Sequence, residues 1–96
     1  MTHEAAVEKL AECRRNIDRI DVQLLALLNE RARVVEIIGT VKRDQAMPVY
    51  EPNREHQVYT NVLEHNHGPL DGDAVRRIFE RVIDEMRTLQ KTRMQS

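Results

Sequence analysis

The stretch LLALLNERARVVEIIGTVK, residues 24–42, decides the fold class, because its apolar residues recur with the spacing of a helix that packs along a seam. The same heptad repeat extends back to Leu10. Its a positions are Leu10, Ile17, Leu24, Arg31 and Ile38, and its d positions are Cys13, Ile20, Leu27, Val34 and Val41. Nine of these ten residues are apolar or cysteine. The exception, Arg31, places a permanent positive charge on an otherwise apolar line.

The repeat predicts one helix from about Glu4 to Arg43, since no Pro or Gly interrupts it before Gly39. A helix of about forty residues is a rod of roughly 60 Å. A compact chain of 96 residues has a radius of gyration of roughly 12–13 Å. The remaining residues of one chain are too few to cover such a rod. The length of this helix therefore predicts an oligomer, and a two-fold dimer is the simplest one.

Two shorter helices are expected after it. Pro48 and Pro52 end the first helix, and Pro52 suits the first turn of a second one that runs to about His65. The loop HNHGPLDGD follows, and Asp71 or Asp73 can cap a third helix. Seven apolar residues of that helix recur at helical spacing: Val75, Ile78, Phe79, Val82, Ile83, Met86 and Leu89. No segment alternates like a strand, so the sequence predicts an all-α chain of three helices.

Composition narrows the class of protein. Residues 1–96 have the length of a single domain, and their formal net charge of −1 argues against a general nucleic-acid binder. One cysteine excludes an internal disulfide and suits a reducing compartment. Neither a signal peptide nor an apolar run of membrane-spanning length is evident. These features predict a soluble, cytoplasmic protein without a membrane segment.

Several polar residues fall on the predicted seams. Lys42 lies three turns beyond Arg31, so two long side chains could grip one small anion between them. Arg14 lies about 25 Å from Arg31 along the same helix, and only a partner's Arg14 could reach that site. Gln90 lies one turn beyond Met86 on the inward line of the third helix. Together these residues describe a polar pocket for a small dianion inside an aliphatic bundle.

Each of these residues also has a simpler explanation. A single polar a-position residue can fix the register of a coiled coil, and Lys42 at an e position can be a solvated charge. Glu55 in a first helical turn is favoured by the helix dipole, and Gln90 can be frayed and exposed. His65 and His67 stand in a loop without further ligands at metal-binding spacing. No metal site, cofactor motif or catalytic nucleophile is therefore expected.

Over roughly residues 7–93 the chain resembles the all-α chorismate mutases of the bacterial type. The resemblance is carried by RRNIDRIDVQLLALLNER, the G-x-x-K of GTVK, PVYEPNRE and IFERVIDEMRTLQ. It implies an intertwined homodimer of three-helix chains, with two active sites that are each completed by an arginine from the other chain. It also implies that chorismate is rearranged to prephenate, the branch step towards phenylalanine and tyrosine, without metal or cofactor.

The resemblance further implies a role for each matching residue. Arg31 and the partner's Arg14 would bind the two substrate carboxylates. Lys42 and Gln90, the catalytic pair, would donate to the ether oxygen as its bond to carbon breaks. The ring hydroxyl would be bound by Glu55 with help from Glu51. Arg54 would line the charged wall of the site.

Two positions depart from the family pattern, and two alternative functions stay open. Met86 stands where some members have a serine that touches a carboxylate, and Glu51 stands where an aspartate is often found. A related lyase that eliminates pyruvate from isochorismate would need nearly the same cations. The intact PVYEPNRE segment favours the mutase over this lyase. The second alternative is a non-catalytic helical module of the shikimate pathway that senses prephenate or docks on another enzyme. Against it stands the joint presence of Arg14, Arg31, Lys42, Glu55 and Gln90.

Overall fold

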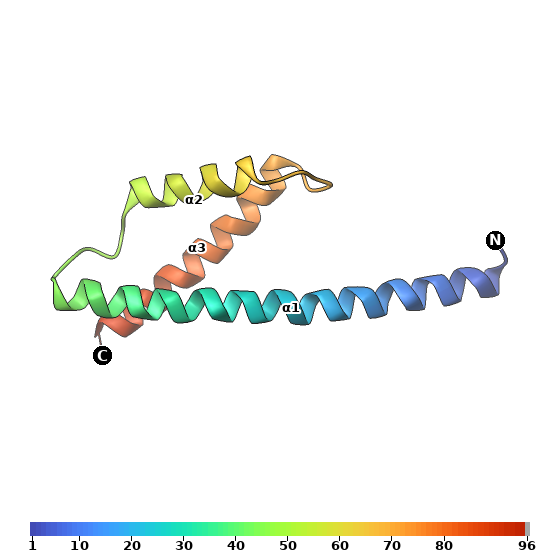
Figure 1. The fold of residues 1–96 in the computed structure, drawn as a ribbon, viewed down its shortest axis with the longest axis horizontal. Coiled ribbons are helices and arrows are strands. Elements are labelled where there is room, and N and C mark those ends of the chain that lie inside the picture. The colour runs from blue at the N-terminus through green and yellow to red at the C-terminus, as the bar shows by residue number, and fades with distance from the viewer. Residues whose placement is uncertain (96) are drawn as a thin grey trace. The chain divides into compact units, whose positions relative to one another are not determined.

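The computed structural model describes residues 1–95, which form three helices and no strand (Figure 1). Helix α1 spans His3–Asp44, α2 spans Pro52–Glu64 and α3 spans Gly72–Gln95. The predicted all-α chain of three helices is confirmed, and the predicted ends of the first two helices lie within one residue of the observed ones. In residues 1–95 no helix is both long enough and apolar enough to cross a bilayer.

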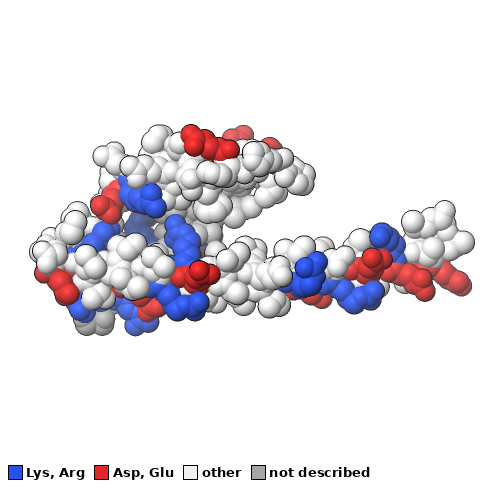
Figure 2. Space-filling model, viewed as in Figure 1, with Lys and Arg blue, Asp and Glu red and all other residues white. Residues whose placement is uncertain are grey.

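The chain divides into two compact units, of which the first, Met1–Arg33, consists of the N-terminal part of α1. Its apolar seam is uncovered in a single chain. The exposed fraction is 52% for Leu10, 54% for Ile17 and 63% for Leu27. Acidic and basic side chains are interspersed along this unit with uncharged surface between them (Figure 2).

The second unit begins at Val34 and contains the end of α1 together with α2 and α3. Its buried apolar residues are Val35, Val75 and Ile83, each 7% exposed. Two polar residues are as deeply buried, Lys42 at 6% and Gln90 at 9% exposed. A small aliphatic interior with two polar side chains at its centre is the setting of the candidate site.

Local signals in the sequence set the helix ends of this unit. The backbone N–H of Met47 donates to the carbonyl of Lys42 at 2.8 Å, and Ala46 has a φ of 53°, so the chain turns sharply after α1. Pro52 is in the first turn of α2. Of the two candidate caps for α3, Asp71 is the one that acts, because its Oδ1 accepts from the N–H of Ala74 at 2.7 Å.

The expected inward row of α3 is correct except at Ile78. Ile78 was expected to face inward, but 49% of it is exposed. At 100° per residue around the α3 axis, the buried residues Val75, Ile83 and Gln90 lie on one face of the helix. Ile78 lies at the edge of that face. The helix therefore packs through a narrower stripe than its apolar residues alone would define.

Gly39 lets α1 and α3 approach closely. A Cβ built at this position would lie 3.3 Å from the backbone oxygen of Gln90 and 3.4 Å from the Cβ of Arg93. On the same side of the crossing, Arg93 Nε lies 2.5 Å from Glu36 Oε2. Because Lys42 follows Gly39 by three residues, the close crossing brings its side chain against α3.

Candidate active site

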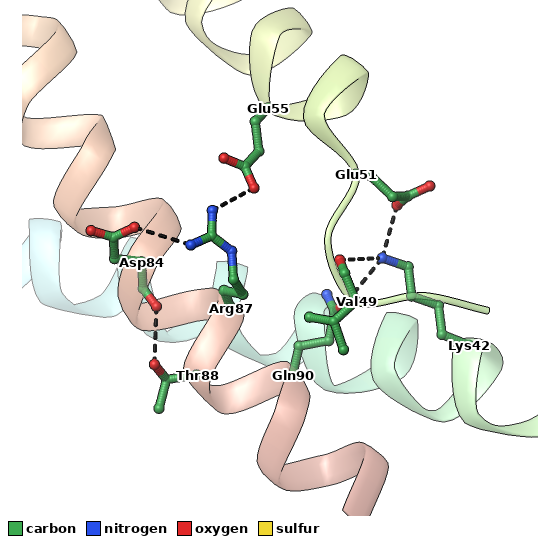
Figure 3. Close-up of polar contacts among 8 residues, drawn as sticks. All are labelled: Lys42, Val49, Glu51, Glu55, Asp84, Arg87, Thr88 and Gln90. Carbon is green, nitrogen blue, oxygen red and sulfur yellow. Dashed lines mark hydrogen bonds and ion pairs between the residues drawn. The ribbon is translucent and has the colours of Figure 1, made fainter. Parts of the chain in front are cut away.

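Lys42 is the centre of the polar cluster (Figure 3). Its Nζ lies 3.0 Å from Gln90 Oε1, 3.1 Å from the carbonyl oxygen of Val49 and 2.8 Å from Glu51 Oε2. An ammonium has three hydrogens to donate, and three acceptors are present. A buried charge is costly unless it is paired and hydrogen-bonded, so these acceptors are what allow Lys42 to be buried.

The contact with Lys42 fixes the orientation of the Gln90 amide. Lysine can only donate, so the amide must turn its oxygen towards Nζ. The amide NH₂ then points away from the ammonium and is available as a donor. The interpretation of Gln90 as a frayed, exposed residue is thereby excluded, since the side chain is buried and hydrogen-bonded.

Glu51 joins the cluster from the segment that leads into α2. It is the residue that precedes Pro52, and its side chain is 46% exposed although its carboxylate pairs with Lys42. Its backbone carbonyl accepts from the N–H of Glu55 at 3.1 Å, which places the two glutamates one helical turn apart. Like charges at this spacing repel each other unless each has a cation.

Arg87 supplies the cation for Glu55. Its Nη2 lies 2.5 Å from Glu55 Oε2 and its Nη1 lies 3.4 Å from Asp84 Oδ1 (Figure 3). The guanidinium carbon lies 5.5 Å from the centre of the Tyr50 ring. The hydrogen bond to Glu55 raises the pKa of Arg87 above its usual value, and the charges of Glu55 and Asp84 act in the same direction against burial. The arginine is therefore a fixed positive charge in the site.

Sequence reasoning did not identify Arg87, although a signal was present. Arg87 follows the buried Ile83 by four residues and precedes Gln90 by three, and both spacings place it on the same side of α3. An arginine on that side needs an acidic partner or solvent. The acidic partner lies 32 residues earlier in α2, which no local pattern reveals.

The sequence also predicts four further site residues: Arg14, Arg31, Arg54 and Met86. Arg54 is exposed, and its Nη1 donates to Gln57 Oε1 at 3.4 Å. Met86 is half-buried on α3, one turn before Gln90, and has no polar hydrogen to offer a carboxylate. In the N-terminal unit, Arg14 is exposed and Arg31 is half-buried. The grouping of Arg14 and Arg31 with the cluster stays a prediction.

Among residues 1–95, the remaining titratable side chains do not form a metal centre. In residues 1–95 no three His, Cys, Asp or Glu side chains converge as metal ligands. His65 instead has its Nδ1 at 2.7 Å from the carbonyl oxygen of Asn61 in its own helix turn. The chemistry that the cluster offers is hydrogen-bond donation and charge from Lys42, Gln90 and Arg87, with two carboxylates as acceptors.

Comparison with known proteins identifies the family to which this chain is similar. Residues 13–91 match the sequence profile described as chorismate mutase type II. A chorismate mutase of Methanocaldococcus jannaschii is 34% identical in an alignment of 89 positions that covers 88% of this chain and 87% of that protein. A bifunctional chorismate mutase/prephenate dehydratase of Aquifex aeolicus is 35% identical over 88% of this chain. The chain spans only 25% of that protein and 23% of its counterpart from Neisseria gonorrhoeae.

Solved structures agree with the sequence match. A chorismate mutase from Thermus thermophilus superposes with a TM-score of 0.85 at 28% identity, covering 86% of this chain and 94% of that one. A chorismate mutase from Helicobacter pylori, crystallised in complex with prephenate, also gives 0.85, at 25% identity over 93% of this chain and 97% of that one. Sequence and fold agree over most of the chain: it belongs to the chorismate mutase type II family.

Proposed function

We propose that this protein is a chorismate mutase that rearranges chorismate to prephenate in the biosynthesis of phenylalanine and tyrosine. The observation that carries the proposal is the buried contact between Lys42 and Gln90. It joins two hydrogen-bond donors from α1 and α3 in a protein of this family. No other pair in the second unit, as far as residue 95, combines such burial with donors that suit a developing negative charge.

The reaction needs little else from the protein. As the ether C–O bond breaks and the new C–C bond forms, electron density accumulates on the ether oxygen, and no atom enters or leaves. Donors that are already in place stabilise that charge without reorganising, and one such donor is worth about 3–4 kcal/mol. Lys42 Nζ and the NH₂ of Gln90 are the donors in this scheme. The cations also hold the substrate folded, with its reacting ends together.

Glu51 is the acceptor that the substrate would displace. All three hydrogens of Lys42 are matched by protein acceptors. The side chain of Glu51 is 46% exposed, whereas Gln90 is buried and Val49 offers a backbone carbonyl, so Glu51 is the one that can leave at least cost. In this scheme an oxygen of the incoming substrate replaces the Glu51 carboxylate as an acceptor for Lys42. Glu51 then turns towards the ring hydroxyl, which donates a hydrogen bond to Glu55.

A homodimer completes the site in this proposal. The apolar seam of α1 is uncovered in one chain, and a second copy with the same heptad repeat is the matching partner. The two-fold arrangement would bring the partner's Arg14 to Arg31 of this chain, where the two arginines bind the carboxylates. The single, free cysteine Cys13 fits a reducing compartment, and we place the protein in the cytoplasm.

A direct assay tests the function. Purified protein is given chorismate, and the product is identified by chromatography and NMR; isochorismate is assayed in parallel. We expect prephenate from chorismate and no pyruvate from isochorismate. Pyruvate from isochorismate alone would establish the lyase instead, and inertness towards both would establish a non-catalytic module.

A pair of lysine variants ties the activity to the site. Lys42→Met should lower kcat/KM by about 100-fold or more, because it removes a donor to the developing charge. Lys91→Met is the matched control, since Lys91 is an exposed lysine next to Gln90 on α3. Equal activities of the two variants would contradict the assignment of the site.

A further inference from the structure

Two ion pairs in the second unit join the start of α2 to the other two helices. Glu51 and Glu55 lie one turn apart at the start of α2. The first is held by Lys42 from α1 and the second by Arg87 from α3 (Figure 3). Under the proposed function, Lys42, Glu51 and Glu55 each contact the substrate. Arg87 has had no function so far.

The guanidinium of Arg87 is fixed by groups from three segments. Glu55 of α2 and Asp84 of α3 accept from its two terminal nitrogens, and the ring of Tyr50 in the connecting segment lies 5.5 Å from its central carbon. The Arg87 side chain is 32% exposed and that of Glu55 is 25% exposed, so the pair is only partly screened by water. Such an arrangement holds the carboxylate of Glu55 in one place.

We propose that Arg87 is a positioning residue that holds the Glu55 carboxylate in place and neutralises it so that Glu55 can accept the ring hydroxyl of a dianionic substrate. This proposal rests on the proposed function. Without a cation beside it, the carboxylate of Glu55 would repel the two carboxylates of the substrate. With Arg87 on Oε2, the other oxygen keeps its lone pairs for the hydroxyl.

The site therefore recognises the hydroxyl through an acceptor of fixed geometry and little net charge. Arg87 itself does not touch the reacting atoms in this scheme. Its effect must then depend on two things: the presence of Glu55, and the presence of a hydroxyl on the substrate. Both dependences can be measured, and a purely structural arginine would show neither.

The experiment measures kcat and KM of the full chain with chorismate and with an analogue in which hydrogen replaces the ring hydroxyl. Arg87→Met removes the charge and keeps the length of the side chain. With chorismate, we expect kcat/KM to fall by about 10- to 100-fold, as for the loss of a hydrogen bond to a charged group. With the analogue, we expect Arg87→Met and wild type to differ by less than about threefold.

Glu55→Gln and the double variant complete the cycle. If Arg87 acts through Glu55, adding Arg87→Met to Glu55→Gln should lower kcat/KM only slightly further. The proposal would be overturned if the losses of kcat/KM in the two single variants multiplied in the double variant. It would also be overturned if Arg87→Met lost as much kcat/KM with the analogue as with chorismate. In either case Arg87 would act directly on the substrate or on the fold.

Two further variants separate positioning from folding. Arg87→Lys keeps a charge for Glu55 but not the fork that also reaches Asp84, so it should restore part of the activity lost in Arg87→Met. Arg81→Met is the matched control, since Arg81 is 78% exposed on the same helix and pairs only with Glu85 among the ion pairs of residues 1–95. If Arg87→Met proves to be unfolded, Arg87→Lys is the variant that decides. If Arg87→Lys is folded but loses the same activity with chorismate as with the analogue, the proposal is also overturned.

The wild-type assay keeps this inference distinct from the proposed function. If wild-type protein leaves chorismate unchanged, the function fails and the role of Arg87 falls with it. If wild type produces prephenate and Arg87→Met does so at an undiminished rate, only the role of Arg87 is wrong.

Discussion

Lys42 Nζ and Gln90 Oε1 lie 3.0 Å apart although 48 residues separate them in the sequence. The two side chains come from α1 and α3 and are both buried. Their contact gives Lys42 an acceptor and turns the NH₂ of Gln90 outward as a donor.

The crossing at Gly39 should be intolerant of a methyl group. Gly39→Ala would place a Cβ 3.3 Å from the backbone oxygen of Gln90, which cannot move without shifting α3. Overpacking of this kind costs about 1–3 kcal/mol, while alanine regains about 1 kcal/mol in helix propensity. We expect a small loss of stability in thermal unfolding and a fall in kcat of about tenfold or more, because Lys42 and Gln90 move apart.

Gly72→Ala is the matched glycine control. A Cβ there would meet only the mobile end of Leu63 at 3.5 Å, an ordinary contact. We expect wild-type kcat from this variant. Full activity of Gly39→Ala would show that the separation of α1 and α3 does not control the geometry of the site.

A glutamate at position 90 should make the activity depend on pH. Gln90→Glu can donate to the ether oxygen only when its carboxyl is protonated, and the reference pKa of glutamate is about 4.3. Burial would raise the pKa of this carboxyl, while Lys42 at the distance seen for Gln90 would lower it. The variant should therefore lose about 100-fold in kcat near pH 7.5 and gain activity as the pH falls towards 5.

The wild-type protein and Gln95→Glu, at an exposed position of the same helix, should keep a broad profile over this range. Circular dichroism at each pH verifies that the variants stay folded. A Gln90→Glu protein with the same activity at both ends of the range would leave Lys42 as the only donor to the breaking bond.

The seam of α1 gives a test of assembly. Leu27 at a d position and Val22 at an outer f position are 63% and 69% exposed in a single chain. In a monomer, lysine at either position should change stability by no more than about 0.5 kcal/mol. In a dimer, Leu27→Lys should destabilise by more than about 2 kcal/mol or dissociate the chains, while Val22→Lys should not.

Sedimentation and urea unfolding at micromolar concentration measure both effects. We expect wild type and Val22→Lys to sediment as dimers. A folded wild-type monomer would contradict the dimer and the shared site with it.

Mixing two inactive variants tests whether Arg14 acts in the partner's site. In a heterodimer of Arg14→Ala and Arg31→Ala chains, one site carries both defects and the other is intact. After random subunit exchange about half of the dimers are mixed, so about one quarter of the wild-type activity should return. Native mass spectrometry checks the exchange. Mixed dimers without recovered activity would place Arg14 in the site of its own chain or outside the site.

Some of the site was predictable because local spacing encodes it. Gln90 continues the inward apolar line of α3 and Lys42 lies three turns beyond Arg31 at an e position, and the structure buries both. The cap at Asp71 and the helix start at Pro52 follow from short-range chemistry in the same way. The pairing of Arg87 with Glu55 was missed, because which cation faces which carboxylate depends on how α2 and α3 pack.

The sequence by itself determined the three helices, their ends to within a few residues and the lines along which they bury apolar side chains. These properties follow from heptad spacing, prolines and caps, which act over a few residues. Only the tertiary structure decided that Gly39 permits the close crossing of α1 and α3, that Lys42 has three acceptors and that Arg87 binds Glu55. Those contacts join residues far apart in the chain, and their geometry depends on helix packing rather than on any local pattern.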